Sequence, residues 1–183
     1  MSKQVNAHIS NKDADLFYKL YLGILEFTNK KYKINLSIDI YNRVFNNYQL
    51  IDVVHKFWDN KIEIVDEFVE KNPYKLTKKE LQLAFNFKKG INDIFIIVKY
   101  ERNYTVVMYD DKFYYIKGLF DNIDTLIPDK MLPYPSRMKI FSFTNCLIYD
   151  GLLEFCDIKL KDGLKKQIYE MLEKSPIYYE LKD

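Results

Sequence analysis

The first half of the chain carries apolar side chains at helical spacing. Four of them recur every three to four positions after Ser10 and predict a first helix: Leu16, Leu20, Ile24 and Phe27. Thr77 and Glu80 stand three residues apart ahead of an apolar run, which is the form of a capping box, and Gly90 suits the position after that helix. The pattern therefore predicts five helical segments: 12–31, 38–46, 50–58, 62–69 and 77–89.

The spacing of apolar residues changes at Asn92, where runs of β-branched and aromatic residues replace the helical pattern. Three such runs, separated by short polar pairs, predict an antiparallel meander: Ile94–Tyr100, Tyr104–Tyr109 and Lys112–Lys117. A short helix is expected around Ile123–Ile127. Three prolines then indicate that Pro128–Ser136 is a crossing loop rather than a strand.

The densest run of strand-forming residues is Met138–Leu160. It surrounds Asp150-Gly151, and an Asp-Gly pair between apolar runs is the strongest short signal for a hairpin. We therefore place this segment at or near the centre of a sheet. A final helix is predicted over 164–174, and Ile177–Leu181 is a short edge strand or a docked tail.

These segments predict an α+β fold in a single domain, 1–183. An N-terminal helical bundle, about 12–89, is expected to pack on a mostly antiparallel sheet, about 93–160, with a C-terminal helix. The change from helix to strand marks a subdomain border near residue 90, although no flexible linker composition accompanies it.

Composition narrows the classes of function. Tyr and Phe together account for 29 residues, only three of the 28 basic residues are arginine, and the net charge is +2. Bidentate recognition of phosphates and base edges relies on arginine, so this balance gives weak support for nucleic-acid binding. The chain has no apolar N-terminal leader and no apolar run near the ~20 residues that cross a bilayer, so we expect a soluble cytoplasmic protein.

Motifs for common chemistries are absent from the sequence. There is no P-loop, GxGxxG or GxSxG, and the two histidines, His8 and His55, lack the spacing of a catalytic or zinc site. Cys146 and Cys156 are expected to be buried thiols rather than a disulfide. No cofactor is therefore expected under the leading hypothesis.

The leading hypothesis rests on aromatic residues. Five tyrosines lie on the predicted meander: Tyr100, Tyr104, Tyr109, Tyr114 and Tyr115. If these rings are exposed, a protein-binding surface is favoured because tyrosine is a preferred interface anchor; if they are buried, they are core. We predict a non-enzymatic binding protein with a protein partner. Exposed rings also stack unpaired bases. Lysine-mediated nucleic-acid binding without cleavage is a further alternative, and its affinity would fall steeply with salt.

An alternative from another class is a Mg²⁺-dependent nuclease. The alternative catalytic set is Asp150, Asp157 and Lys159, with Glu154 as a further metal ligand and Asp129 as an upstream carboxylate. Two carboxylates on neighbouring strands hold Mg²⁺, and a nearby lysine stabilises charge at the scissile phosphate. The structural interpretation is that Asp150 serves the turn and the others face solvent.

The C-terminal third, from about Pro133 to Leu181, resembles a segment of uncharacterised bacterial proteins. The residues that carry the resemblance are Ile148-Tyr149-Asp150-Gly151-Leu152-Leu153, with Gly163 at a later turn. The resemblance implies a proline-bounded loop, a strand, a turn and a final helix. It implies no activity and transfers no catalytic residue to this chain.

Overall fold

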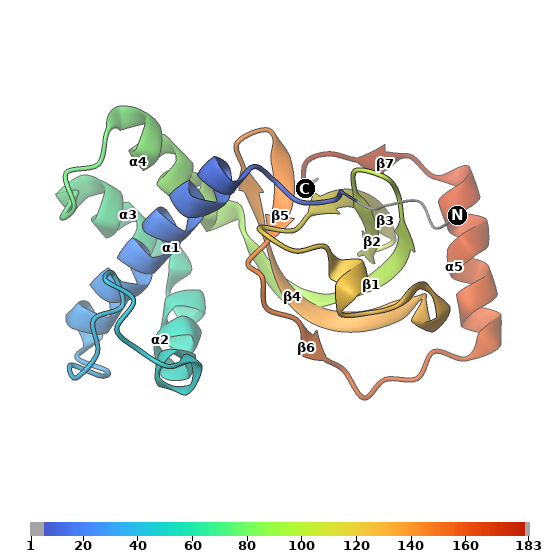
Figure 1. Cartoon of the computed structure of the whole chain (residues 1–183), viewed down its shortest axis with the longest axis horizontal. Coiled ribbons are helices and arrows are strands. Elements are labelled where there is room, and N and C mark those ends of the chain that lie inside the picture. Colours follow the sequence, from blue (N-terminus) through green and yellow to red (C-terminus); the bar gives the residue numbers. More distant parts are fainter. Residues whose placement is uncertain (1–5, 182–183) are drawn as a thin grey trace. The chain divides into compact units, whose positions relative to one another are not determined.

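The computed structural model describes residues 6–181, which divide into a helical unit, Lys12–Lys89, and a sheet unit made of residues 6–11 and 90–181. Figure 1 shows helices in the first unit, and strands with one further helix in the second. The predicted α+β class is confirmed, because the sheet unit holds seven strands in one mixed sheet. No helix among residues 6–181 is long and apolar enough to cross a membrane.

The helical unit consists of four α-helices and one short 3-10 helix. Their bounds are α1 Asn11–Tyr32, α2 Asn47–Asp59, α3 Lys61–Lys71, α4 Lys78–Phe85 and η1 Asn86–Lys89. Aromatic rings form much of the core, and the ring centroid of Phe17 lies 5.4 Å from those of both Tyr21 and Phe87. Four of the five predicted segments are therefore helical, since each buries apolar side chains on one face.

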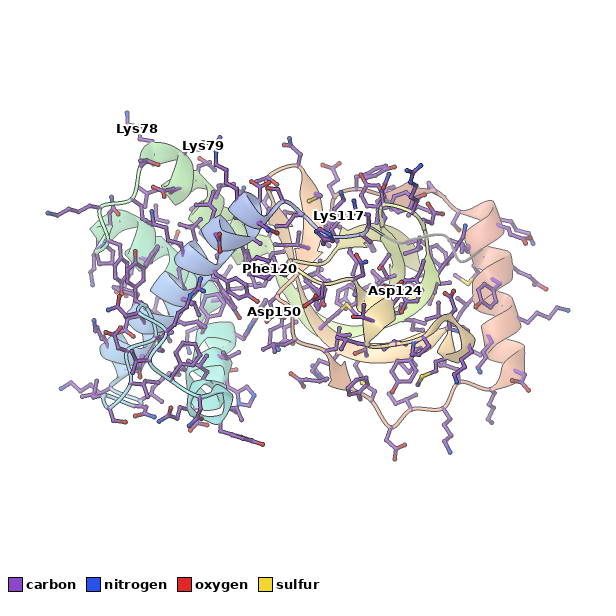
Figure 2. The ribbon with its side chains drawn as sticks, viewed as in Figure 1. Lys78, Lys79, Lys117, Phe120, Asp124 and Asp150 are labelled. Carbon is purple, nitrogen blue, oxygen red and sulfur yellow. The ribbon has the colours of Figure 1, made fainter. Side chains whose placement is uncertain are left out.

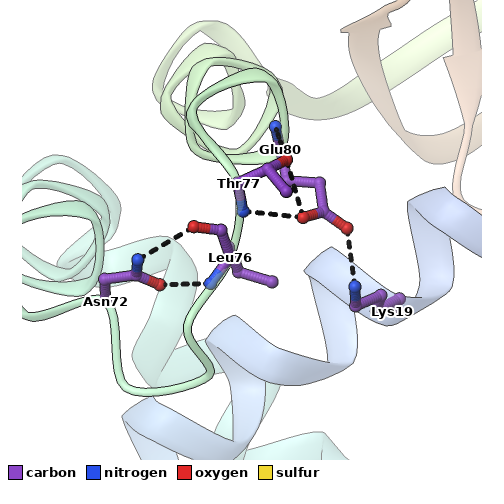
Figure 3. A network of polar contacts seen from close by, with 5 residues as sticks. All are labelled: Lys19, Asn72, Leu76, Thr77 and Glu80. Carbon is purple, nitrogen blue, oxygen red and sulfur yellow. Dashed lines mark hydrogen bonds and ion pairs between the residues drawn. The ribbon is translucent and has the colours of Figure 1, made fainter.

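The start of α4 shows how a local signal sets a helix boundary (Figure 3). The Thr77 hydroxyl accepts a hydrogen bond from the amide of Glu80 at 3.3 Å, and the Glu80 carboxylate accepts one from the amide of Thr77 at 2.8 Å. The same carboxylate lies 2.6 Å from Nζ of Lys19 on α1. Just before it, Asn72 ends α3 in the left-handed conformation, and its side chain bonds both backbone groups of Leu76. The predicted capping box is confirmed, and it also ties α4 to α1.

The predicted helix over 38–46 is wrong, because side chains take the hydrogen bonds that a helix would use. The buried Glu26 carboxylate accepts a hydrogen bond from the amide of Ile40 at 2.8 Å. Asp39 accepts hydrogen bonds from the amide and the side chain of Asn42. Arg43 has a φ of 62°, which no right-handed helix contains. Such side-chain bonds compete with a helix by satisfying the backbone in turns.

The sheet unit contains seven strands whose pairing closes a barrel. Their bounds are β1 Ile91–Tyr100, β2 Thr105–Tyr109, β3 Lys112–Lys117, β4 Tyr134–Phe143, β5 Cys146–Tyr149, β6 Glu154–Phe155 and β7 Ile177–Tyr178. The predicted meander β1–β2–β3 is confirmed. β5 pairs parallel with β3 and antiparallel with β4, and β4 pairs antiparallel with β1. Each strand of the ring β1-β2-β3-β5-β4 therefore has a neighbour on both sides.

Asp150-Gly151 does not form the predicted hairpin. The tight turn lies at Thr144-Asn145 instead, between β4 and β5, where Phe143 pairs with Cys146 and Thr144 has a φ of 53°. Gly151 has a φ of 90° and turns the chain out of β5, after which β6 pairs with β4. Only Gly151 of the pair has a positive φ, and the bend that it forms does not join neighbouring strands.

Strand β4 begins earlier than the prolines indicate. Pro135 pairs with Ile96 of β1, so the predicted crossing loop Pro128–Ser136 is wrong for its last three residues. A proline is tolerated near the start of a strand, where a missing amide removes few ladder hydrogen bonds. Two short 3-10 helices, η2 Ile123–Thr125 and η3 Asp129–Met131, occupy the segment between β3 and β4.

Apolar side chains alternate between the two faces of the meander. Inward-facing residues such as Val107, Tyr114 and Ile116 join one core cluster inside the barrel. Outward-facing residues form a second cluster with the last helix, α5 Asp162–Lys174: Val98, Val106 and Phe113 pack with Ile168 of that helix. The predicted C-terminal helix is confirmed as α5. Of Ile177–Leu181, predicted as a short edge strand or a docked tail, only Ile177–Tyr178 form a strand, β7.

Candidate interaction surface

Three tyrosine rings meet on the outer side of β2 and β3. Tyr104 precedes β2, Tyr115 lies on β3 and Tyr179 follows β7. The ring centroid of Tyr115 lies 5.0 Å from that of Tyr104 and 4.8 Å from that of Tyr179, while Tyr104 and Tyr179 are 5.5 Å apart. Nζ of Lys117 lies 4.9 Å from the Tyr104 centroid. We call Tyr104, Tyr115 and Tyr179 the tyrosine cluster.

Strand alternation explains how these rings come together. Tyr115 lies between the inward-facing Tyr114 and Ile116, so it points outward, and alternation places Lys117 on the same face. β7 pairs parallel with β3 in the register Tyr114↔Tyr178. The next residue, Tyr179, therefore follows alongside Tyr115. The cluster is built from three segments, of which the last is far away in sequence.

The tyrosine cluster is partly open to solvent. Burial raises the pKa of Tyr115, and contact with Glu101 raises it further; burial also raises the pKa of Tyr104. Glu101 is paired with Lys99 at 3.0 Å. Tyr179 is 54% exposed, whereas Tyr104 and Tyr115 are half-buried. The cluster thus offers aromatic faces and phenol hydroxyls beside Lys117 and the Lys99–Glu101 ion pair.

The other three tyrosines of the predicted surface pack in or against the core cluster inside the barrel. Tyr114 is buried inside it. Tyr100 is half-buried, and its hydroxyl donates a hydrogen bond to the carbonyl of Ile127 at 2.6 Å. Tyr109 stacks on Phe95 with ring centroids 4.7 Å apart. Only Tyr104 and Tyr115 of the five face outward, and Tyr179, absent from the predicted set, completes their surface.

Asp150, the turn residue of the alternative nuclease set, is a buried carboxyl at the end of β5 (Figure 2). Asp150 is only 3% exposed, and its Oδ1 accepts a hydrogen bond from the amide of Leu152 at 3.2 Å. Burial raises its pKa to about 6, although the nearby Lys139 opposes the shift. Nζ of the buried Lys139 also lies 3.1 Å from Oε1 of Glu154. Lys139 is therefore the lysine that stands beside Asp150 and Glu154.

The remaining residues of that set lie on an exposed segment. Asp157 and Lys159 are exposed and fall between β6 and α5, and Asp129 is exposed at the start of η3. Residues 6–181 contain no group of three or more His, Cys, Asp or Glu side chains placed to hold a metal ion. The nuclease hypothesis stays a prediction, with Asp150 and Glu154 as its only residues that share a charged neighbour.

The two histidines and the two cysteines lie in four different segments of the chain. Nδ1 of His8 lies 2.9 Å from the carbonyl of Ile9, and His55 is exposed on α2. Cys146 and Cys156 are both free thiols. Comparison with protein-family models, with curated proteins and with solved structures gave no match.

Proposed function

We propose that this chain is a non-enzymatic binding protein that engages a protein partner through the tyrosine cluster. The observation that carries the proposal is the meeting of Tyr104, Tyr115 and Tyr179 on one partly exposed surface. Tyrosine combines a large, rigid apolar face with a hydroxyl that remains able to hydrogen-bond, and it is enriched among residues that dominate binding energy.

Charge favours a protein over a nucleic acid as the partner. Residues 90–181 contain 12 Lys or Arg residues and 14 Asp or Glu residues. A polyanion gains affinity chiefly from neutralised phosphates and released counterions, which a slightly acidic unit does not supply. Lys99, next to the tyrosine cluster, already pairs with Glu101. Mixed charge around aromatic anchors is typical of the rim of a protein–protein interface.

A light-activated cross-linking amino acid tests this proposal in the full chain. Benzoylphenylalanine replaces Tyr179 in one variant and Tyr169 in the control, because Tyr169 lies on α5 and is also exposed, at 40%. We expect position 179 to capture a defined protein from cell extract, position 169 to miss it, and Tyr104→Ala to abolish its capture. Equal capture at both positions, or capture that survives Tyr104→Ala, would contradict the proposal.

Single-stranded nucleic acid is the second candidate partner, and the barrel is the observation that favours it. A closed ring β1-β2-β3-β5-β4 has the strand order of OB folds, which bind oligonucleotides on the face of strands 2 and 3 and on the loop between strands 1 and 2. Tyr104 lies in that loop and Tyr115 on that face.

Fluorescence anisotropy with a labelled oligothymidylate of about 20 nucleotides separates the two candidates. If the partner is single-stranded nucleic acid, the oligothymidylate should bind, its affinity should fall steeply as salt is added, and Tyr115→Ala should weaken the binding. No binding of the oligothymidylate at low salt would exclude the nucleic-acid candidate and leave the proposal of a protein partner.

A further inference from the structure

The apolar outer face of β1–β2–β3 is covered by the end of the chain. Residues 160–181, which we call the C-terminal arm, contain Leu160, α5 and β7. Four residues of the arm pack with Ile168 against Val98, Val106 and Phe113: Leu160, Met171, Leu172 and Ile177. The face beneath the arm is therefore apolar and would meet water if the arm were displaced.

The helix of the arm, α5, is little buried. Ile168 is the only fully buried side chain of α5, whereas Leu164 and Tyr169 of the same helix are 44% and 40% exposed. The N-cap residue of α5, Lys161, makes no side-chain capping hydrogen bond. β7 contributes two paired residues. Segments with little burial and few backbone bonds open at lower free energy than the core does.

The chain that leads into the arm can act as a hinge. Residues 156–161 belong to no helix or strand, and 157–159 are exposed. By contrast, the five strands of the barrel pair with one another without any residue of the arm. The strand pairing of the barrel therefore does not depend on the arm, although Tyr178 and Leu181 of the arm pack against the core cluster inside it.

The same arm supplies Tyr179 to the tyrosine cluster. Its position depends on the pairing Phe113↔Ile177 and Tyr114↔Tyr178, which places Tyr179 beside Tyr115. Without the docked arm the cluster keeps only Tyr104 and Tyr115, and the most exposed of its rings is lost.

We infer that the C-terminal arm is a latch whose docking assembles the partner-binding surface and whose release dismantles it. This inference rests on the proposed function for its consequence, but the release of the arm is a property of the chain alone. Ile168 is the residue that holds the latch, because it alone among the α5 side chains is fully buried in the outer cluster.

Hydrogen exchange on the full chain tests the latch. We expect the amides of α5 to exchange faster than those of β1–β5 in the wild type. Ile168→Asp should accelerate exchange across α5 by about 100-fold and leave the barrel amides protected. The control, Gln167→Asp, places the same charge on the exposed side of α5 and should change neither.

Cross-linking from Arg102, an exposed residue outside the arm, tests the consequence. Partner capture from position 102 should fall at least tenfold in Ile168→Asp and stay unchanged in Gln167→Asp. Loss of protection in the barrel as well as α5 would overturn the inference, since the arm would then be part of one cooperative fold. Undiminished capture with a released arm would also overturn it while leaving the proposed function intact. Absence of capture in the wild type would contradict the proposed function, and exchange alone would then decide whether the arm is a latch.

Discussion

The amide of Asp150, the residue that follows β5, donates a hydrogen bond to the carbonyl of Lys139 on β4 at 3.2 Å. The side chains of both residues are buried. Burial of the Asp150 carboxyl raises its pKa, and the neighbouring Lys139 opposes that rise. The pKa of Asp150 is raised from 3.8 to about 6, mainly because burial disfavours the charged form.

The contribution of Asp150 to stability should fall as the pH rises from about 4 to 6. In this window the folded protein binds more protons at Asp150 than the unfolded chain does, so the free energy of unfolding decreases with pH, by about 3 kcal/mol in total. Denaturant unfolding at several pH values measures this. Asp150→Asn should remove the decrease, whereas the exposed control Asp157→Asn should keep it. A wild-type profile without the decrease would contradict the assignment.

Thr77→Ala should destabilise the helical unit by about 1 kcal/mol, because it removes the hydroxyl that caps α4. Thr77→Ser keeps a hydroxyl in reach of the Glu80 amide and is the matched control. The measurement is denaturant unfolding followed by far-ultraviolet circular dichroism. Equal losses in the two variants would mean that the capping bond contributes nothing.

Two glycines should respond to alanine in opposite directions. A Cβ on Gly118 would stand 1.9 Å from the carbonyl oxygen of Asp121, so the backbone must move and the barrel should lose more than about 2 kcal/mol. Gly163 lies in α5 with open space around it, so Gly163→Ala should stabilise that helix by about 0.5–1 kcal/mol. Thermal unfolding of both variants checks the signs, and a neutral Gly118→Ala would contradict the close approach.

Tyr179→Ala should weaken binding of the captured partner by about 30-fold, the effect of removing an interface hot spot. The barrel should keep its stability, because Tyr179 lies outside both core clusters. Tyr169→Ala removes an equally large ring from α5 and should leave the affinity within about twofold. Isothermal titration with the purified partner distinguishes the two, and similar affinities for both variants would argue against the tyrosine cluster.

Signals that act within one turn or one strand were readable from the sequence. The capping box of Thr77 and Glu80 set the start of α4, and apolar spacing located α1, α2, α3 and α5. The meander was also predictable from the sequence, because strands joined by such short polar turns pair with their neighbours in the chain. In each case the deciding contacts join residues close in sequence, so the pattern contains the information.

Tertiary structure alone decided which strands meet. Asp150-Gly151 has the local chemistry of a hairpin, yet β5 pairs with β4 through Thr144-Asn145 and with β3 in parallel. Likewise, the apolar pattern of residues 38–46 predicted a helix, but the carboxylate of Glu26 accepts a hydrogen bond from the amide of Ile40.

The candidate surface divides in the same way. Their place on the predicted meander was enough to nominate Tyr104 and Tyr115, together with three tyrosines that pack in or against the barrel core. Tyr179 joins them only because β7 pairs in parallel with β3, some 60 residues earlier in the chain. Parallel pairing across such a distance leaves no local pattern, since its register is set by the packing of α5 and the barrel rather than by a turn.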